Sequence, residues 1–264
     1  MPILELENVN FVYQGKNGSS EFSLNNVDLK INKGEFISIL GPNGSGKSTL
    51  LKIVSGIFQP ARGNVLLDSI PVKSYSKKNL AKFMAYVPQT FSVAFPFSVF
   101  EIVMMGRTPY MNMFGYENLK DIDVVNSSLE KVGIYHLRNK GINEVSGGEA
   151  QRAFIARALA QNPRILLLDE PNAHLDIEHQ ITIFNTLDQL NSDSELTILM
   201  VSHDLNLAGF YGDRILFMKE GEIKMDDAKK NILNEDNIRT IFNVESRVEK
   251  SPGGDYFSVN IVPK

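Results

Sequence analysis

The stretch Gly41-Pro42-Asn43-Gly44-Ser45-Gly46-Lys47-Ser48-Thr49 decides the fold class of this chain. The apolar run Phe36 to Leu40 before it predicts a buried strand, and Ser48 to Val54 predicts the first turns of a helix. Glycines let a loop turn so that consecutive N–H groups point at phosphate oxygens, beside the positive end of the helix. The pattern therefore predicts a phosphate-binding loop for a nucleoside triphosphate.

The side chains that follow the glycines extend this interpretation. Lys47 is expected to reach the β and γ phosphates of the nucleotide, and Ser48 is expected to place its hydroxyl on Mg²⁺. The alternative is a glycine-rich turn with an ordinary surface lysine, a pattern that chance produces in roughly one per cent of chains of this length. We expect the whole loop, residues 41 to 49, to line the nucleotide.

A second short strand is predicted at Ile165 to Leu168, where four apolar residues precede Asp169 and Glu170. Ligands of open parallel sheets bind at the carboxyl ends of the strands, which is where both acids would lie. Asp169 is predicted to hold Mg²⁺ through a water, and Glu170 to orient the water that attacks the γ-phosphate. The alternative is that the two acids only begin a solvated loop.

His203 follows another apolar run, Leu196 to Val201, so it should emerge at the same edge of the sheet. From there its imidazole could donate a hydrogen bond to the γ-phosphate or to the attacking water. The other three histidines, at positions 136, 174 and 179, lie in polar segments and are expected to be surface residues.

With these motifs in place, the chain resembles the ATP-binding subunit of an ABC transporter over nearly its whole length. Ser146-Gly147-Gly148-Glu149 matches the signature motif of that family, preceded by Val145 where leucine is commoner. The resemblance implies that the signature of one protomer closes on the γ-phosphate held by a second copy, in a head-to-tail homodimer. Independently of the family, these residues open a predicted helix and so form a second anion site at a helix N-terminus. Alternatively, they are only a helix N-cap.

Three further residues take roles from the resemblance. Gln89 corresponds to the glutamine that touches Mg²⁺ and relays the nucleotide state to the membrane partner, and otherwise it is a surface glutamine. Asp176 ends the stretch Asn172 to Asp176, which resembles the D-loop although asparagine replaces the usual threonine. Tyr13 matches the aromatic residue that stacks on adenine, and otherwise it packs on the core.

The periodicity of the chain predicts an α/β fold with an antiparallel layer over residues 1 to 40. Further strands are predicted near 64–67, 84–87, 165–168, 196–201 and 214–218, alternating with helical stretches as in an α/β sheet. Helices are predicted at 99–107, 118–132, 149–161 and 235–242. A terminal hairpin is predicted from strands 247–250 and 256–262, with a turn at 252–254. The resemblance implies a P-loop NTPase (RecA-like) core with an inserted helical subdomain. We expect a single ABC ATPase domain, with a nucleotide-binding lobe of 1–88 and 163–225, a helical signature lobe of 89–162 and a small cap of 226–264.

Composition narrows the class further. The chain has 264 residues, 43% of them apolar, a net charge of −4 and no cysteine. The basic residues are scattered, which argues against a nucleic-acid partner, and no thiol is present for a disulfide or a metal site. The first residues do not resemble a secretion signal, and no apolar run approaches the ~20 residues needed to span a bilayer. The resemblance implies a cytoplasmic protein, attached to the membrane through separate integral permease subunits that receive cargo from a substrate-binding protein.

Two stretches narrow the subfamily. Residues 98–109, with Gly106-Arg107-Thr108-Pro109, and 203–208, His-Asp-Leu-Asn-Leu-Ala, are similar to importers of iron siderophores, haem or cobalamin. Zinc, manganese or molybdate remain open as cargo, and so does the ATPase half of an exporter. A non-transport ABC ATPase of DNA repair, chromosome organisation or the ribosome is disfavoured, because the chain has no room for a long coiled coil or a second cassette.

Overall fold

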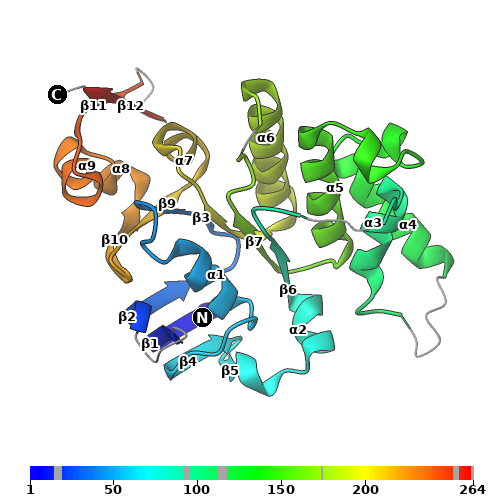
Figure 1. The fold of residues 1–264 in the computed structure, drawn as a ribbon, viewed down its shortest axis with the longest axis horizontal. Helices are drawn as coiled ribbons and strands as arrows, with labels where there is room; N and C mark the ends of the chain where they lie inside the picture. Colours follow the sequence, from blue (N-terminus) through cyan, green and yellow to red (C-terminus); the bar gives the residue numbers. More distant parts are fainter. Residues whose placement is uncertain (15–19, 92–94, 112–117, 174, 252–255, 263–264) are drawn as a thin grey trace. The chain divides into compact units, whose positions relative to one another are not determined.

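The computed structural model describes residues 1–14, 20–91, 95–111, 118–173, 175–251 and 256–262 (Figure 1). These residues group into two compact units, one formed by residues 1–74 and 197–264 and the other by residues 75–196. None of the helices within the described ranges has the length and apolar character that crossing a membrane requires.

The first unit contains an antiparallel sheet in the order β2-β1-β4-β5. Its strands are β1 (Leu4–Gln14), β2 (Ser20–Ile31), β4 (Arg62–Leu67) and β5 (Ile70–Pro71). The predicted antiparallel layer at the N-terminus is thus confirmed. The assignment of 64–67 to the α/β sheet is wrong, because β4 pairs antiparallel with β1. The physical reason is visible in its burial: β4 keeps exposed positions, whereas a strand of a covered parallel sheet is buried on both faces.

The same unit contains β3 (Phe36–Leu40), β8 (Thr197–Val201), β9 (Arg214–Lys219) and β10 (Glu222–Ala228). β3 pairs in parallel with β8 and with β9, and β10 pairs antiparallel with β9. All five residues of β3 and of β8 are buried, as their apolar runs predict. β10 was not predicted, because its acidic residues and partial exposure hide the period of a strand.

The helices of this unit follow the strand ends. α1 (Lys47–Val54) follows β3 and the glycine loop, α7 (Leu205–Tyr211) follows β8, and a single 3-10 turn η1 (Val72–Ser74) follows β5. The register pairs Ile39 of β3 with Val201 of β8, and the Ser202 N–H donates to the Ile39 carbonyl oxygen at 3.1 Å. The glycine loop and the segment of His203 therefore leave the sheet side by side at one edge.

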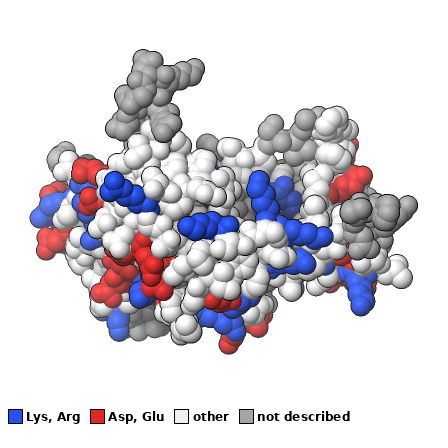
Figure 2. All heavy atoms as spheres, turned by 90° about the horizontal axis from the view of Figure 1, so that it is seen from below, with Lys and Arg blue, Asp and Glu red and all other residues white. Residues whose placement is uncertain are grey.

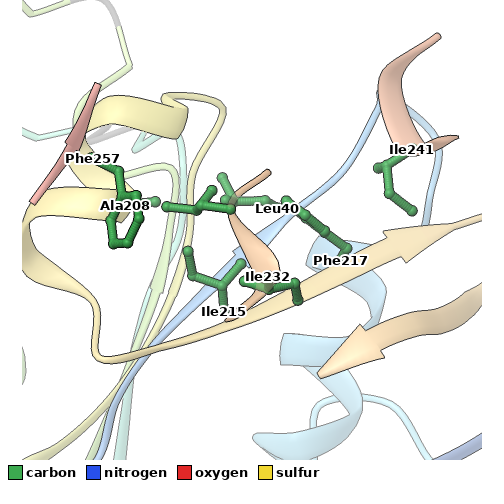
Figure 3. Packing of buried hydrophobic residues seen from close by; sticks show 8 residues of the cluster. Leu40, Ala208, Ile215, Phe217, Ile232, Ile241 and Phe257 are labelled. Atoms are coloured by element: carbon green, nitrogen blue, oxygen red, sulfur yellow. The ribbon is translucent and has the colours of Figure 1, made fainter. Parts of the chain in front are cut away.

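The C-terminal part is built into the core of this unit. It comprises α8 (Lys229–Ile232), α9 (Glu235–Phe242), β11 (Glu245–Lys250) and β12 (Phe257–Val262), which confirms the predicted helix and both strands of the hairpin. Residues 252–254, the predicted turn, lie outside the described residues. Figure 3 shows side chains of these elements packed with Leu40, at the end of β3, and Ala208, on α7.

A side-chain amide fastens the hairpin to α7. Asn206 accepts a hydrogen bond from the Val259 N–H at 2.6 Å and donates one to the Val259 carbonyl oxygen at 3.3 Å. The side chain thereby pairs with both backbone groups of one residue of β12, much as a neighbouring strand would. This gives the asparagine of the His-Asp-Leu-Asn-Leu-Ala stretch an intramolecular structural role.

The second unit is mainly helical, as predicted for residues between Gln89 and Pro163. Its helices are α2 (Lys77–Phe83), α3 (Val99–Met104), which continues as the 3-10 turn η2 (Met105–Arg107), α4 (Leu119–Lys131), α5 (Gly147–Ala160) and α6 (Ile177–Ser194), with 3-10 turns η3 (Tyr135–Leu137) and η4 (Ile142–Glu144). Two parallel strands complete it, β6 (Met84–Val87) and β7 (Ile165–Asp169).

A buried arginine ties three segments of this unit together. The Arg107 guanidinium donates to Asp121 of α4 at 2.8 Å and to the Ala160 carbonyl oxygen at the end of α5 at 2.6 Å. Its Cζ lies 3.9 Å from the centre of the Tyr110 ring. Gly106 allows the backbone beside Arg107 to lie close to α5, because a Cβ on Gly106 would overlap the Arg157 carbonyl oxygen. The Gly106-Arg107 pair of the subfamily stretch therefore holds η2, α4 and α5 together.

The face drawn in Figure 2 carries charges of both signs. On the face drawn in Figure 2, Lys and Arg side chains occur together with Asp and Glu side chains, separated by uncharged surface. A face of this kind carries no uniform field of one sign.

Candidate nucleotide-binding site

The glycine loop of the first unit has the backbone that its sequence predicts. Gly44 has φ 78° and Gly46, the N-cap of α1, has φ 102°, a region that side chains with a Cβ rarely adopt. Because the helix begins at once with Lys47, the loop brings its N–H groups to the positive end of α1. The backbone of the loop therefore suits an anion, and phosphate binding by residues 41–49 stays a prediction.

Lys47 lies within this loop and is only 5% exposed. Its Nζ donates to the carbonyl oxygens of Gly41 at 2.8 Å and Pro42 at 3.0 Å. A lysine ammonium that leaves bulk water needs such acceptors, since an unpaired buried charge is costly. The arrangement holds a positive charge where phosphate oxygens would meet the loop amides.

Tyr13, at the end of β1, lies beside the helix that follows the loop. Its hydroxyl oxygen is 3.3 Å from the Thr49 Oγ1, and its ring makes edge contacts with Phe11 at 5.0 Å and Phe58 at 5.7 Å between centroids. The ring thus packs on neighbouring aromatic residues and is fixed next to α1. Stacking of this ring on adenine stays a prediction.

His203 is exposed in the segment between β8 and α7. The residues on either side of it are well anchored: the Asp204 N–H donates to the Ser202 hydroxyl at 3.0 Å, and Asp204 caps α7 by accepting from the N–H groups of Asn206 and Leu207. Ser202 is fully buried. A rigid support therefore presents the imidazole at the sheet edge that also carries the glycine loop.

In the second unit, Asp169 ends β7 and is 4% exposed. The Tyr86 hydroxyl donates to its Oδ2 at 3.1 Å. Tyr86 was not predicted as a site residue. Its position pairs with Leu167, two residues before Asp169, in the parallel register of β6 and β7, and only that pairing identifies it.

Glu170 and Gln89 are brought together in the same unit. The Gln89 side-chain amide donates to the Glu170 carboxylate at 2.5 Å. The Glu170 backbone has φ 50°, an uncommon value for a residue with a side chain. Strained backbone of this kind often accompanies functional positions.

The signature residues form the N-terminus of α5. The Ser146 hydroxyl accepts from the Glu149 N–H at 3.3 Å, and the Glu149 carboxylate accepts from the Ser146 N–H at 2.8 Å and from its hydroxyl at 2.9 Å. The pKa of Glu149 is lowered by these bonds, chiefly by the bond from the Ser146 N–H and then by the bond from its hydroxyl. Ser146 is thus a helix N-cap, as the alternative interpretation held, while the N–H groups of Gly147 and Gly148 belong to the first turn, which has no intrahelical acceptors for them.

The D-loop residue Asp176 caps α6. It accepts from the His179 N–H at 2.9 Å, and the His179 Nδ1 lies 2.6 Å from the same carboxylate oxygen. His136 is exposed, as predicted, whereas the His179 side chain is only 30% exposed. His174 lies outside the described residues.

The predicted site residues thus fall into two sets. The first unit carries Tyr13, the loop 41–49 and His203, and the second carries Gln89, Asp169, Glu170, the signature and Asp176. Within the described ranges, no group of three or more His, Asp or Glu side chains could hold a metal ion by itself. Any ion held here would need oxygen atoms from phosphate and water as well, which is how Mg²⁺ binds to nucleotides in enzymes.

Comparison with known proteins places these observations in a family. The model of the family described as "ABC transporter" matches residues 24–173. The iron(3+)-hydroxamate import ATP-binding protein of Bacillus subtilis is 36% identical over 86% of this chain and 84% of its own length.

Two solved structures are similar in fold. One, of a metal-chelate type ABC transporter in an inward-facing conformation, gives a TM-score of 0.85 at 29% identity, covering 100% of this chain and 98% of the other. The second is a bacterial ABC transporter cassette solved as a dimer, with a TM-score of 0.73 at 33% identity over 86% of this chain and 98% of the other.

Proposed function

The chain belongs to the ABC transporter family, and we propose that it is the ATP-hydrolysing subunit of an importer that takes up a metal chelate. The observation that carries the proposal is that one chain holds two helix N-termini suited to anions, the loop before α1 and the signature before α5. Two such sites on each chain suit two nucleotides shared between two copies.

Binding of ATP is assigned to the first set of residues. The backbone N–H groups of residues 41 and 43–49 and the Lys47 ammonium surround the phosphates, and the Tyr13 ring stacks on adenine. The buried, carbonyl-held position of Lys47 supports this role, because it fixes a positive charge inside the loop. The functional lobes are proposed to be 1–88 with 163–225 for the nucleotide, 89–162 for the signature and 226–264 as a cap.

Mg²⁺ is the cation that this donor set fits. The Ser48 hydroxyl, the Asp169 carboxylate and the Gln89 amide are hard oxygen donors, and Asp169 is a buried carboxylate oriented by Tyr86. Magnesium supplies neutralisation of charge on the phosphates when it is bound.

Hydrolysis is assigned to Glu170, Gln89 and His203. Glu170 orients the attacking water, Gln89 steadies the Glu170 carboxylate through their hydrogen bond, and His203 donates to the γ-phosphate. Because phosphoryl transfer depends mostly on positioning and electrostatics, removing one of these groups should cost on the order of 10²–10³ in rate, or roughly 3–4 kcal/mol.

Pairing completes the site in this proposal. The signature residues Ser146, Gly147, Gly148 and Glu149, together with Asp176, close on the nucleotide of a second copy, and the dimer reopens after hydrolysis. The dimeric form of a similar cassette supports this arrangement. Membrane permease subunits bind the dimer at the cytoplasmic face of the membrane and receive cargo from a substrate-binding protein. The iron-hydroxamate relative and the metal-chelate type transporter favour a metal chelate as cargo, which we propose to be an iron siderophore, haem or cobalamin.

The test compares the Glu170→Gln variant with the wild type. The variant should bind ATP, pair in its presence and hydrolyse it on the order of 10²-fold more slowly or worse, because water is no longer oriented. Light scattering with and without ATP and Mg²⁺ gives the mass, and phosphate release gives the rate. Glu130→Gln, at an exposed position of α4, is the matched control and should behave as the wild type.

A second variant isolates the signature. Ser146→Arg in the Glu170→Gln background should bind ATP with unchanged affinity but stay monomeric, because the arginine side chain blocks the approach of the partner's nucleotide. Undiminished pairing of this double variant would remove the signature from the interface, and wild-type hydrolysis by Glu170→Gln would remove Glu170 from the mechanism.

A further inference from the structure

His179 connects the D-loop to the signature within one chain. Its backbone N–H and its ring Nδ1 both engage the Asp176 carboxylate, at 2.9 and 2.6 Å. These two bonds, the backbone one first, lower the pKa of Asp176 below its ordinary value. Asp176 itself is two-thirds exposed, so its position is set chiefly by these bonds to α6.

The other side of the imidazole lies on Gly148. A Cβ built on Gly148 would overlap the His179 Cδ2 and would lie 2.6 Å from its Cγ and 3.0 Å from its Cβ. Rotation of the ring away from the new methyl group would break its contact with Asp176, and it would still leave a tight approach of 3.0 Å to the Cβ of His179. The ring therefore occupies the place that a side chain at 148 would take, and Gly148 is buried beneath it.

Helix capping alone does not require this contact. The third residue of a helix can bond back to the N-cap residue without touching any other helix. Here the same side chain bonds to the cap of α6 and packs on the first turn of α5. The proposed function assigns Asp176 and the signature to the nucleotide of the partner. The imidazole of His179 lies between these two segments and contacts both.

We propose that His179 is a positioning residue, which holds Asp176 and the signature turn at Gly148 in the relative arrangement that closure on a second copy needs. The proposal rests on the proposed function and deepens it. Tyr13, the glycine loop and Lys47 lie in the other compact unit. Substitution of His179 should therefore leave the affinity of one chain for ATP unchanged and act on the steps that need both copies.

Two variants separate the bond from the packing. His179→Asn keeps a side-chain nitrogen near the position of Nδ1 but leaves the space over Gly148 unfilled. His179→Phe keeps a ring over Gly148 but has no donor for Asp176. Each should lower kcat on the order of 10- to 100-fold with KM for ATP unchanged, because small misplacements of reacting groups have effects of that size. His136→Ala, at an exposed histidine of the same unit, is the matched control and should match the wild type.

The same substitutions in the Glu170→Gln background should weaken ATP-dependent pairing, measured by light scattering. Wild-type kcat in His179→Asn would show that only the cap bond matters and would overturn the proposal. If kcat falls by the expected amount but KM for ATP also rises, or ATP binding is lost, the substitution has damaged the fold in general. That outcome would also overturn the proposal. If Glu170→Gln alone does not pair while the wild type lacks ATPase activity, the proposed function fails instead.

Thermal unfolding tests the contact itself. Gly148→Ala should lower the melting temperature, and adding His179→Ala should restore most of that loss, because the ring that the new methyl group meets is gone. A double-mutant cycle measures this coupling. Additive effects of the two substitutions would show that the ring does not rest on Gly148 and would overturn the proposal.

Discussion

Tyr86 shows how a single hydroxyl supports a buried acid. Asp169 is 4% exposed and accepts a hydrogen bond from the Tyr86 hydroxyl at 3.1 Å, so the hydroxyl replaces part of the water that the carboxylate loses on burial. Hydrogen bonds to charged groups contribute about 1.5–3 kcal/mol each. Residues that orient an acid in this way also affect its affinity for a metal ion.

We therefore expect Tyr86→Phe to lower the free energy of unfolding by about 1–3 kcal/mol and to raise the Mg²⁺ concentration for half-maximal ATPase activity about tenfold. Urea unfolding and a Mg²⁺ titration of the rate measure the two effects. Tyr135→Phe, in η3, is the control. An unchanged Mg²⁺ requirement would contradict a role of Tyr86 in orienting Asp169.

At the scale of the element, the signature is held by a reciprocal cap whose strength depends on pH. The Ser146 N–H and hydroxyl stabilise the ionised Glu149 and lower its pKa from the ordinary value of 4.5. A group with a lowered folded pKa stabilises the protein above its unfolded pKa, and the contribution is lost as the pH falls through the folded value. The cap should therefore weaken below pH 4.5.

Glu149→Gln should consequently melt at a lower temperature than the wild type at neutral pH, and the difference should shrink as the pH falls below 4.5. Calorimetry between neutral and acidic pH measures the difference. Ser146→Ala removes the hydroxyl both as a donor to the Glu149 carboxylate and as an acceptor for the Glu149 N–H. The pH-dependent part of its effect should be smaller than that of Glu149→Gln, since the backbone bond is the larger cause of the lowered pKa. A difference independent of pH would contradict the account.

The packing of α3, α4 and α5 depends on the buried Arg107, whose side chain is 9% exposed and whose partner Asp121 is 2% exposed. Arg107→Met should cost about 3–5 kcal/mol, because Asp121 would be left as an uncompensated buried charge. Replacing both residues, as in Arg107→Met with Asp121→Leu, should recover part of the loss. Urea unfolding measures the series, and Lys120→Ala at an exposed position of α4 should stay within about 0.5 kcal/mol of the wild type. Equal losses in the single and double variants would contradict this explanation.

At the scale of the whole molecule, the C-terminal segment is part of the core of its unit and not an appendage. Phe257 is 6% exposed and packs in one cluster with Leu40, which directly precedes the glycine loop, and Ala208, which follows His203 along α7 (Figure 3). β3, which leads into the glycine loop, and β12 thus share one buried hydrophobic cluster.

Phe257→Ala should therefore destabilise this unit by about 3–5 kcal/mol, as expected when a large buried ring is truncated. Denaturant unfolding gives the value, and Ser258→Ala, at the exposed neighbouring position, is the control. A loss below about 1 kcal/mol would mean that the hairpin packs loosely on the unit.

Elements with strong local signals could be predicted from the order of the residues alone. The strand 36–40, the glycine loop and α1 follow from one motif, because the order of the residues dictates which backbone groups meet a phosphate. The strands before Asp169 and His203 follow from short apolar runs, which are buried on both faces. A motif and a continuous apolar run carry their meaning within a few residues, so sequence alone reveals them.

Features that depend on contacts between distant segments could be identified only in the folded chain. Nothing local distinguishes a strand of the antiparallel layer such as β4 from a strand of the parallel sheet, and nothing local selects Tyr86, Arg107 or His179. Each of these owes its role to atoms far along the chain: the Asp169 carboxylate, the carbonyl at the end of α5, and the bare Cα of Gly148. The hydrophobic period of a sequence indicates which side of an element is buried, but it does not indicate which residues pack against that side. The partners of Tyr86, Arg107 and His179 are therefore identified only in the folded structure.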